Sequence, residues 1–123
     1  MSNVATWFEI PVKDMPRAKR FYQSVLHTDF KDEDMGACQM AIFNCEAPAV
    51  GGMLVSGEHY EPNRTGAIVY LNGGEDLSQP LQRVAEQGGS VLLPKTPIHD
   101  GECGYFAHFL DSEGNRVGLY SPT

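Results

Sequence analysis

The stretch WFEIPVKDMPRAKRFYQSVL, residues 7–26, contains a complete strand-to-helix unit. Residues 7–12 predict a strand, and Asp14 follows as a helix N-cap whose carboxylate can accept from the amides of the first turn. After Asp14, apolar residues recur at i, i+3, i+4 and i+7, which is the spacing of one helix face. These residues are Ala18, Phe21, Tyr22 and Val25. The stretch therefore predicts a strand followed by an amphipathic helix.

The same plan recurs further along the chain, from residue 67 onward. Residues 67–72 predict a strand, and the Gly-Gly pair at 73–74 turns the chain. Asp76 or Ser78 can cap a second helix. One face of that helix would carry Leu77, Leu81, Val84 and Ala85. The Gly-Gly pair at 88–89 predicts its end, so the chain is an approximate internal duplication.

Each predicted helix is followed by three short strands. In the first half they cover roughly 29–34, 38–44 and 50–55, and in the second half roughly 90–95, 104–110 and 115–120. Each half is thus β-α-β-β-β. The fold class is α+β, with two paired βαβββ modules that form a curved mixed sheet around a cleft.

We expect a single domain with two modules joined by a linker. Module 1 covers about residues 1–56, the linker about 57–64, and module 2 about 65–123. One helix covers only one face of a sheet, so the other face of each sheet stays bare. The cleft on the bare side is where we expect a ligand to bind.

The composition limits the classes of partner and the compartment. The chain has 123 residues and a formal net charge of −7, from 16 acidic and 9 basic residues. This balance argues against nucleic acid and against an anionic membrane surface. No run approaches the roughly 18 apolar residues that span a bilayer, and the first residues lack a signal-peptide pattern, so we expect a cytoplasmic protein. Cys38, Cys45 and Cys103 lack CxxC spacing and are expected as free thiols.

Several motifs occur in a characteristic order. The first half contributes residues 8–12, Asp14, Ala18, 21–22 and 25–26, and the second half contributes 88–89, Gly104 and 111–119. Together they resemble the vicinal oxygen chelate (VOC) superfamily, which includes glyoxalase I, extradiol dioxygenases, and fosfomycin and bleomycin resistance proteins. Ser112 stands where the superfamily's closing D-P-x-G-N hairpin has proline.

The resemblance covers about residues 4–121, and small proteins related to lactoylglutathione lyase are the most similar group. It implies a homodimer. Metal-dependent members place four ligands on the cleft face. The resemblance puts these positions at Trp7, Gly52 (or its neighbour Met53), Ala67 and Gly118.

None of those four residues is a metal ligand. Indole N–H is only a donor, and glycine and alanine offer no side-chain lone pair. We therefore expect no metal and no cofactor. A rearranged site that combines His99, Glu102 and His108 stays open, although no spacing rule brings these three together.

Strand alternation from the former ligand positions predicts the wall of the cleft. The ligand-binding candidates are Trp7, Glu9, Val69, Leu71, Arg116 and Tyr120. The same alternation places His108 on one face with Phe106 and Leu110. The wall is mostly apolar and aromatic, with Glu9 as its main carboxylate, and it suits a small, partly apolar ligand.

Different classes of function stay open. One is metal-free binding of a small organic molecule in the cleft. The alternative is a glyoxalase-like lyase or isomerase, or a dioxygenase-related enzyme, with Glu9 as general base or with a rearranged divalent metal site. A third is an interaction module in which Trp7 closes the cleft.

Overall fold

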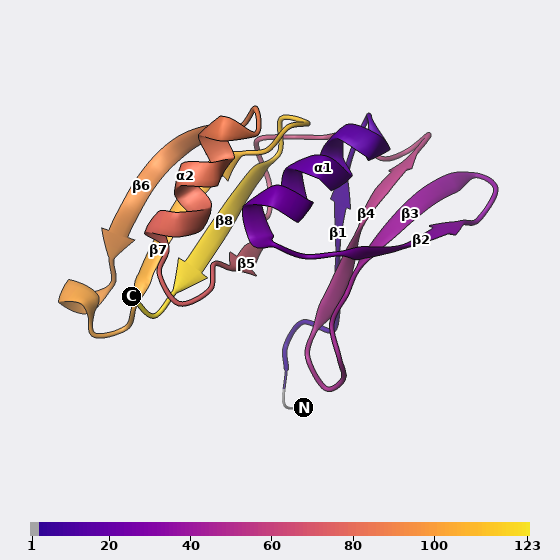
Figure 1. Cartoon of the computed structure of the whole chain (residues 1–123). Coiled ribbons are helices and arrows are strands. Elements are labelled where there is room, and N and C mark those ends of the chain that lie inside the picture. Colours follow the sequence, from indigo (N-terminus) through magenta and orange to yellow (C-terminus); the bar gives the residue numbers. More distant parts are fainter. Residues whose placement is uncertain (1–2) are drawn as a thin grey trace.

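The computed structural model describes residues 3–123 as two modules of the same design (Figure 1). Module 1 contains β1 (Trp7–Pro11), α1 (Met15–Leu26), β2 (Phe30–Asp34), β3 (Cys38–Phe43) and β4 (Gly51–Gly57). Module 2 contains β5 (Tyr70–Asn72), α2 (Ser78–Glu86), β6 (Ser90–Pro97), a short 3-10 helix (His99–Gly101), β7 (Tyr105–Leu110) and β8 (Arg116–Ser121). The predicted α+β fold of paired βαβββ modules is confirmed.

The strands form two four-stranded mixed sheets, one in each module. The strand orders are β1-β4-β3-β2 and β5-β8-β7-β6. In each sheet the first strand of the module runs parallel to the last, and the other neighbours are antiparallel. The two first strands, β1 and β5, are therefore edge strands.

Helix α1 follows the prediction closely. The Asp14 carboxylate accepts from the backbone N–H of Arg17 at 3.0 Å, which confirms the N-cap. The predicted apolar face is buried. The helix ends at His27, whose φ of 52° and ψ of 49° are left-handed. A non-glycine residue adopts this conformation at a modest cost, and it turns the chain towards β2.

Helix α2 departs from the prediction in two ways. Its N-cap position is Leu77, which makes no side-chain cap, although Asp76 accepts from the N–H of Ser78 at 3.0 Å. Ala85 is exposed and not packed, because Leu77, Pro80 and Val84 already define the buried face at i, i+3 and i+7. In the part of the chain that the structure covers, no helix has the length and hydrophobicity needed to cross a bilayer.

The two modules share one hydrophobic core. The ring of Phe21 on α1 lies 5.9 Å from that of Phe109 on β7, and the ring of Tyr22 lies 5.9 Å from that of Phe43 on β3. Helix α1 also contacts α2, and Figure 1 shows α1 at the boundary between the modules. Burial of these rings in one cluster joins the modules into a single packed unit.

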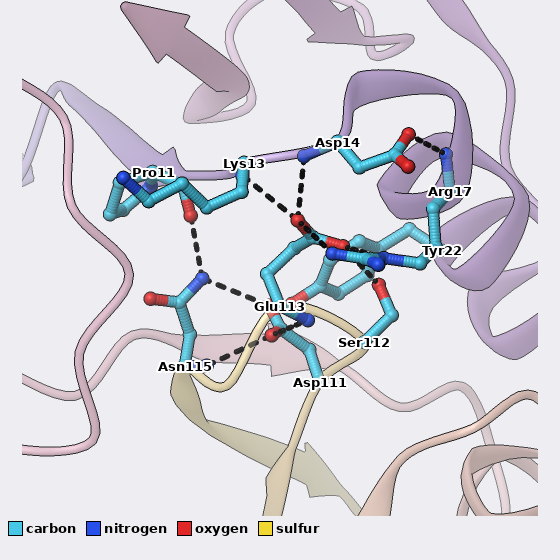
Figure 2. A network of polar contacts seen from close by, with 9 residues as sticks. All are labelled: Pro11, Lys13, Asp14, Arg17, Tyr22, Asp111, Ser112, Glu113 and Asn115. Carbon is cyan, nitrogen blue, oxygen red and sulfur yellow. Dashed lines mark hydrogen bonds and ion pairs between the residues drawn. The ribbon is translucent and has the colours of Figure 1, made fainter. Parts of the chain in front are cut away.

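A hairpin of module 2 is hydrogen-bonded to the start of module 1 (Figure 2). The side-chain amide of Asn115 donates to the carbonyl oxygen of Pro11 at 2.7 Å. Glu113 accepts from the backbone N–H groups of Lys13 and Asp14, both at 2.8 Å. The two bonds to Glu113 pair backbone N–H groups just before α1 that the helix itself leaves unpaired, and the Asn115 bond pairs the carbonyl at the end of β1.

Side chains of α1 complete the same network. The Arg17 guanidinium donates to Glu113 at 2.6 Å, and the side chain of Glu113 is fully buried. The hydroxyl of Tyr22 donates to Asp111 at 2.6 Å. Burial, followed by the charge of Asp111, raises the pKa of Tyr22 well above its usual value. The closing hairpin therefore fixes module 2 to module 1 through buried polar contacts.

The strand predicted at residues 67–72 is shorter than expected, and its orientation differs. Only Tyr70–Asn72 pairs as β5, with Leu71 opposite Leu119 in the core. The predicted placement of Leu71 on the bare face of the sheet differs from the structure, in which this side chain is 7% exposed and belongs to the core cluster. Tyr70, on the other face of β5, is 48% exposed.

Candidate functional site

The two modules have equivalent positions on the faces of their sheets that the helices leave bare, which we call the open faces. The backbone N–H of Val12 donates to the carbonyl of Val55, and that of Gly73 donates to the carbonyl of Tyr120, at the same point of each module. Three residues before these N–H donors lie Glu9 and Tyr70, and two residues before the carbonyl acceptors lie Met53 and Gly118. Glu9 pairs with Met53 as Tyr70 pairs with Gly118, so the two pairs are equivalent. These four residues occupy the centre of the open faces.

These central residues do not suit a divalent metal. Glu9 supplies one carboxylate, while Met53 and Tyr70 offer a thioether and a phenol, and Gly118 has no side chain. Divalent cations in such sites need several carboxylate or imidazole ligands. Within residues 3–123, no three His, Cys, Asp or Glu side chains lie close enough together to hold an ion.

Two of the positions that the resemblance assigned to metal ligands lie elsewhere. Gly52 faces the helix side, where a Cβ on it would lie 2.4 Å from the ring of Phe8. The open-face residue of that strand is its neighbour Met53. Ala67 precedes β5 and is exposed. Gly118 is on the open face as expected, and the ring of Tyr70 covers it.

The structure does not bring together His99, Glu102 and His108, the three residues of the rearranged metal site considered from the sequence. His99 and Glu102 lie in and just after the 3-10 helix and are exposed. His108 lies on β7 and is 8% exposed. Strand pairing puts His108 opposite Gly118, with Phe106 opposite Tyr120, which confirms the predicted alternation on β7.

His108 is the centre of a hydrogen-bonded chain on the open face of module 2. Its Nε2 lies 2.6 Å from the hydroxyl oxygen of Tyr70. Its Nδ1 lies 2.9 Å from Nη2 and 3.2 Å from Nε of Arg116. Burial, and then the charge of Arg116, lower the pKa of His108. The imidazole is thus held neutral between a phenol and a guanidinium.

A large hollow lies between the modules and is lined by residues of β1, β4 and β5 and of both helices. Its volume is about 630 Å³. The apolar lining is Phe8, Val25, Leu26, Phe43, Val50, Leu71 and Pro80. The polar lining includes His27, Asn44, Cys45, Tyr70, Asn72, Glu75, Gln79 and Arg83. Polar and apolar residues line the hollow in about equal number, and its volume lies in the range of small-molecule sites.

The six predicted ligand-binding residues divide between different places. Glu9, Val69 and Arg116 line a second inter-module hollow of about 140 Å³. The negative charge of Glu9 is the main cause of a raised pKa for Tyr60, so the linker residue lies next to this carboxylate.

The other three predicted residues lie apart from this small hollow. Leu71 lines the large hollow but is mostly buried in the core. Tyr120 lies outside both hollows, and its hydroxyl donates to the carbonyl oxygen of Cys103 at 2.8 Å. Trp7 also lies outside both, but its ring lies 3.3 Å from where a Cβ on Gly51 would be, and Gly51 lines the large hollow. Trp7 is 45% exposed.

A hollow of similar size lies within module 1 alone. It has a volume of about 560 Å³ and is formed by α1 with β2 and β3. Its lining combines Met15 and Met40 with Lys19, Arg20, Asp32 and Asp34. This hollow touches neither Trp7 nor the central positions of the open faces.

Sequence reasoning missed Tyr70 as an open-face residue and named Met53 only as the alternative to Gly52. The run from Ala67 to Leu71 is apolar at nearly every position, so it contains no alternation that could set which residues face outward. The alternation of β7 and β8 did contain a signal. His108 and Arg116 could be placed on one face from the hairpin at residues 111–115 that joins these strands.

Comparison with known proteins gives a consistent set of similarities. Residues 5–119 match the family model of the Glyoxalase/Bleomycin resistance protein/Dioxygenase superfamily. A Mycobacterium tuberculosis protein named "Putative glyoxylase CFP32" is 26% identical over 119 residues, which cover 93% of this chain. The chain spans 44% of the length of that relative, so it corresponds to less than half of it.

Solved structures with similar folds include enzymes and binding proteins. A variant of glyoxalase I from Zea mays has a TM-score of 0.74 at 19% identity, and the match covers 94% of this chain and 45% of that one. TnmS3, an antibiotic binding protein from Streptomyces sp. CB03234, has a TM-score of 0.66 at 25% identity, and the match covers 100% of this chain and 99% of that one.

Proposed function

Because the chain belongs to the Glyoxalase/Bleomycin resistance protein/Dioxygenase superfamily, we propose that it binds a small, planar organic molecule at the junction of its modules, without a metal. The observation that carries this proposal is the hollow of about 630 Å³ lined by both modules. The half-exposed ring of Tyr70 lines this hollow, and the half-exposed ring of Trp7 lies beside Gly51, which also lines it. Aromatic rings of this kind stack on planar ligands.

The metal-free part of the proposal rests on the residues at the central open-face positions. Reactions of metal-dependent relatives need a cation to polarise substrate oxygens. Glu9 alone cannot hold one in this chain, since Met53, Tyr70 and Gly118 add no carboxylate or imidazole. Elemental analysis of the purified protein should give well under one equivalent of nickel, zinc, iron or manganese. A stoichiometric metal that survives dialysis would contradict this part.

The relatives support a binding function, and some of their names also give a reason to test for enzymatic activity. TnmS3, which matches this chain over its whole length, is an antibiotic binding protein. CFP32 and the maize protein carry names that refer to glyoxalase chemistry. Glu9 is the carboxylate of this chain that could act as a general base on the open face.

A thermal-shift screen of a metabolite library, with EDTA present, tests the proposal. A molecule that binds only the native state raises the melting temperature in proportion to the logarithm of its concentration over its Kd. We expect planar, partly apolar hits that mass spectrometry recovers unchanged after long incubation. Conversion of a hit, with conversion reduced in Glu9→Gln, would show an enzyme instead. A library without any planar hit would contradict the proposed ligand class.

A further inference from the structure

The hydrogen bonds that link Arg116, His108 and Tyr70 have a defined direction of donation. A guanidinium has donors only, and both Nε and Nη2 of Arg116 lie within hydrogen-bond distance of Nδ1 of His108. Nδ1 must therefore carry the lone pair. A neutral imidazole has one ring proton, which the hydrogen-bond pattern assigns to Nε2.

The tautomer of His108 determines what Tyr70 can do. Nε2–H donates to the hydroxyl oxygen of Tyr70 across 2.6 Å. The hydroxyl proton of Tyr70 is therefore not used by His108. No acceptor for this proton is found among the hydrogen bonds of residues 3–123, and the Tyr70 side chain is half-exposed. The free proton can be donated to a molecule outside the chain.

The charges around these three hydrogen-bonded side chains favour a negatively charged acceptor for the Tyr70 proton. Within residues 3–123, no Asp or Glu oxygen lies within ion-pair distance of Arg116. The positive charge of Arg116 polarises the donors that follow it, which are Nε2–H of His108 and the hydroxyl of Tyr70. Hydrogen bonds from such a donor are strongest to a charged oxygen.

We propose that Tyr70 donates a hydrogen bond to an anionic oxygen conjugated to the ring of the planar ligand, such as a phenolate or enolate, with His108 and Arg116 as positioning residues. This inference rests on the proposed function and specifies its ligand class. The ring of Tyr70 lies over Gly118, which gives the phenol a fixed position on the open face. The ligand is thus recognised by stacking and by one directed bond from the Tyr70 hydroxyl.

The test compares two probes of nearly the same shape by calorimetry at a pH where 4-nitrophenol is ionised. The probes are 4-nitrophenolate and the neutral methyl ether 4-nitroanisole. We expect wild-type protein to bind the phenolate roughly tenfold to hundredfold more tightly, the usual gain from a hydrogen bond to a charged group. Tyr70→Phe keeps the ring and should remove this preference. Tyr105→Phe, on the opposite face of the module 2 sheet, is the matched control and should retain it.

The outcomes separate this inference from the proposed function. Equal binding of both probes to wild-type protein, or a preference that survives Tyr70→Phe, overturns the inference and leaves planar-ligand binding intact. Absence of binding by either probe contradicts both proposals.

The positioning role has its own readout. Nitrogen-15 NMR of the His108 ring should show the neutral Nε2–H tautomer at pH 7, and Arg116→Leu should shift the ring towards Nδ1–H. An Nδ1–H tautomer or an imidazolium in the wild-type protein would overturn the assigned direction of donation.

Discussion

The phenol ring of Tyr70 lies directly over the backbone of Gly118. A Cβ on Gly118 would be 2.4 Å from Cδ1 and 2.9 Å from Cγ of that ring. The two residues are paired neighbours in the parallel ladder of β5 and β8. The place where the superfamily resemblance puts a metal ligand is therefore filled by a ring from the adjacent strand.

Gly118→Ala should destabilise the protein by about 1–3 kcal/mol, because the methyl group overlaps the Tyr70 ring near its base. Tyr70→Ala should remove most of that penalty, since it leaves room for the methyl group. Urea unfolding of the two single variants and the double variant measures the coupling. Additive effects would contradict the packing described for this pair.

The fold could be predicted because its signals are local. Asp14 caps α1, the i, i+3, i+4, i+7 face of α1 is buried, and the closing hairpin turns where its polar residues indicate. The orientation of β5 could not be predicted from such signals. It is decided by the pairing of Leu71 with Leu119, which joins residues distant in sequence.

The site was predicted less completely for a related reason. Alternation correctly placed His108 with Phe106 and Leu110, but it could not show that Tyr70 from another strand would meet His108. The hydrogen bonds that join the closing hairpin to module 1 could not be predicted from the sequence either. Asn115 lies in the closing hairpin, and its bond to Pro11 joins residues 104 positions apart.

Glu113→Gln should lower the free energy of unfolding by about 1–3 kcal/mol at pH 7, because a buried acceptor of two amides and a guanidinium loses its charge. Burial alone raises the pKa of Glu113, but Arg17 and the amides of Asp14 and Lys13 outweigh burial and lower the pKa below 4.5.

The sign of the pH dependence follows from that lowered pKa. The stabilisation by Glu113 is complete above the unfolded-state pKa and is lost as pH falls through the folded-state pKa. The difference between wild-type protein and Glu113→Gln should therefore shrink below about pH 4.5. Glu33→Gln, at a weak 3.7 Å pair with Lys31, serves as the control and should have little effect. A difference that does not depend on pH would contradict the role of the charge.

We expect the protein to be a homodimer, as the family resemblance implies. Trp7, Val50, Tyr70 and Tyr120 are large side chains that remain substantially exposed, and such surfaces often lie at interfaces. Sedimentation at tens of micromolar should give twice the chain mass of 13.5 kDa. Val50→Asp should weaken the dimer, while Val91→Asp, on the other edge of the module 2 sheet, should not. A monomer at these concentrations would contradict the expectation.

Trp7 emission should report directly whether a planar molecule binds at the junction of the two modules. Trp7 is the only tryptophan of the chain, and its ring lies beside Gly51, which lines the large hollow. A hit from the thermal-shift screen should quench or shift this emission in a saturable titration. Trp7→Ala should weaken its binding about tenfold, in line with the loss of a stacked ring, whereas Met35→Ala at the exposed turn between β2 and β3 should not. Confirmed hits that leave Trp7 emission unchanged, and that bind Trp7→Ala as tightly as wild-type protein, would show that the binding site lies elsewhere.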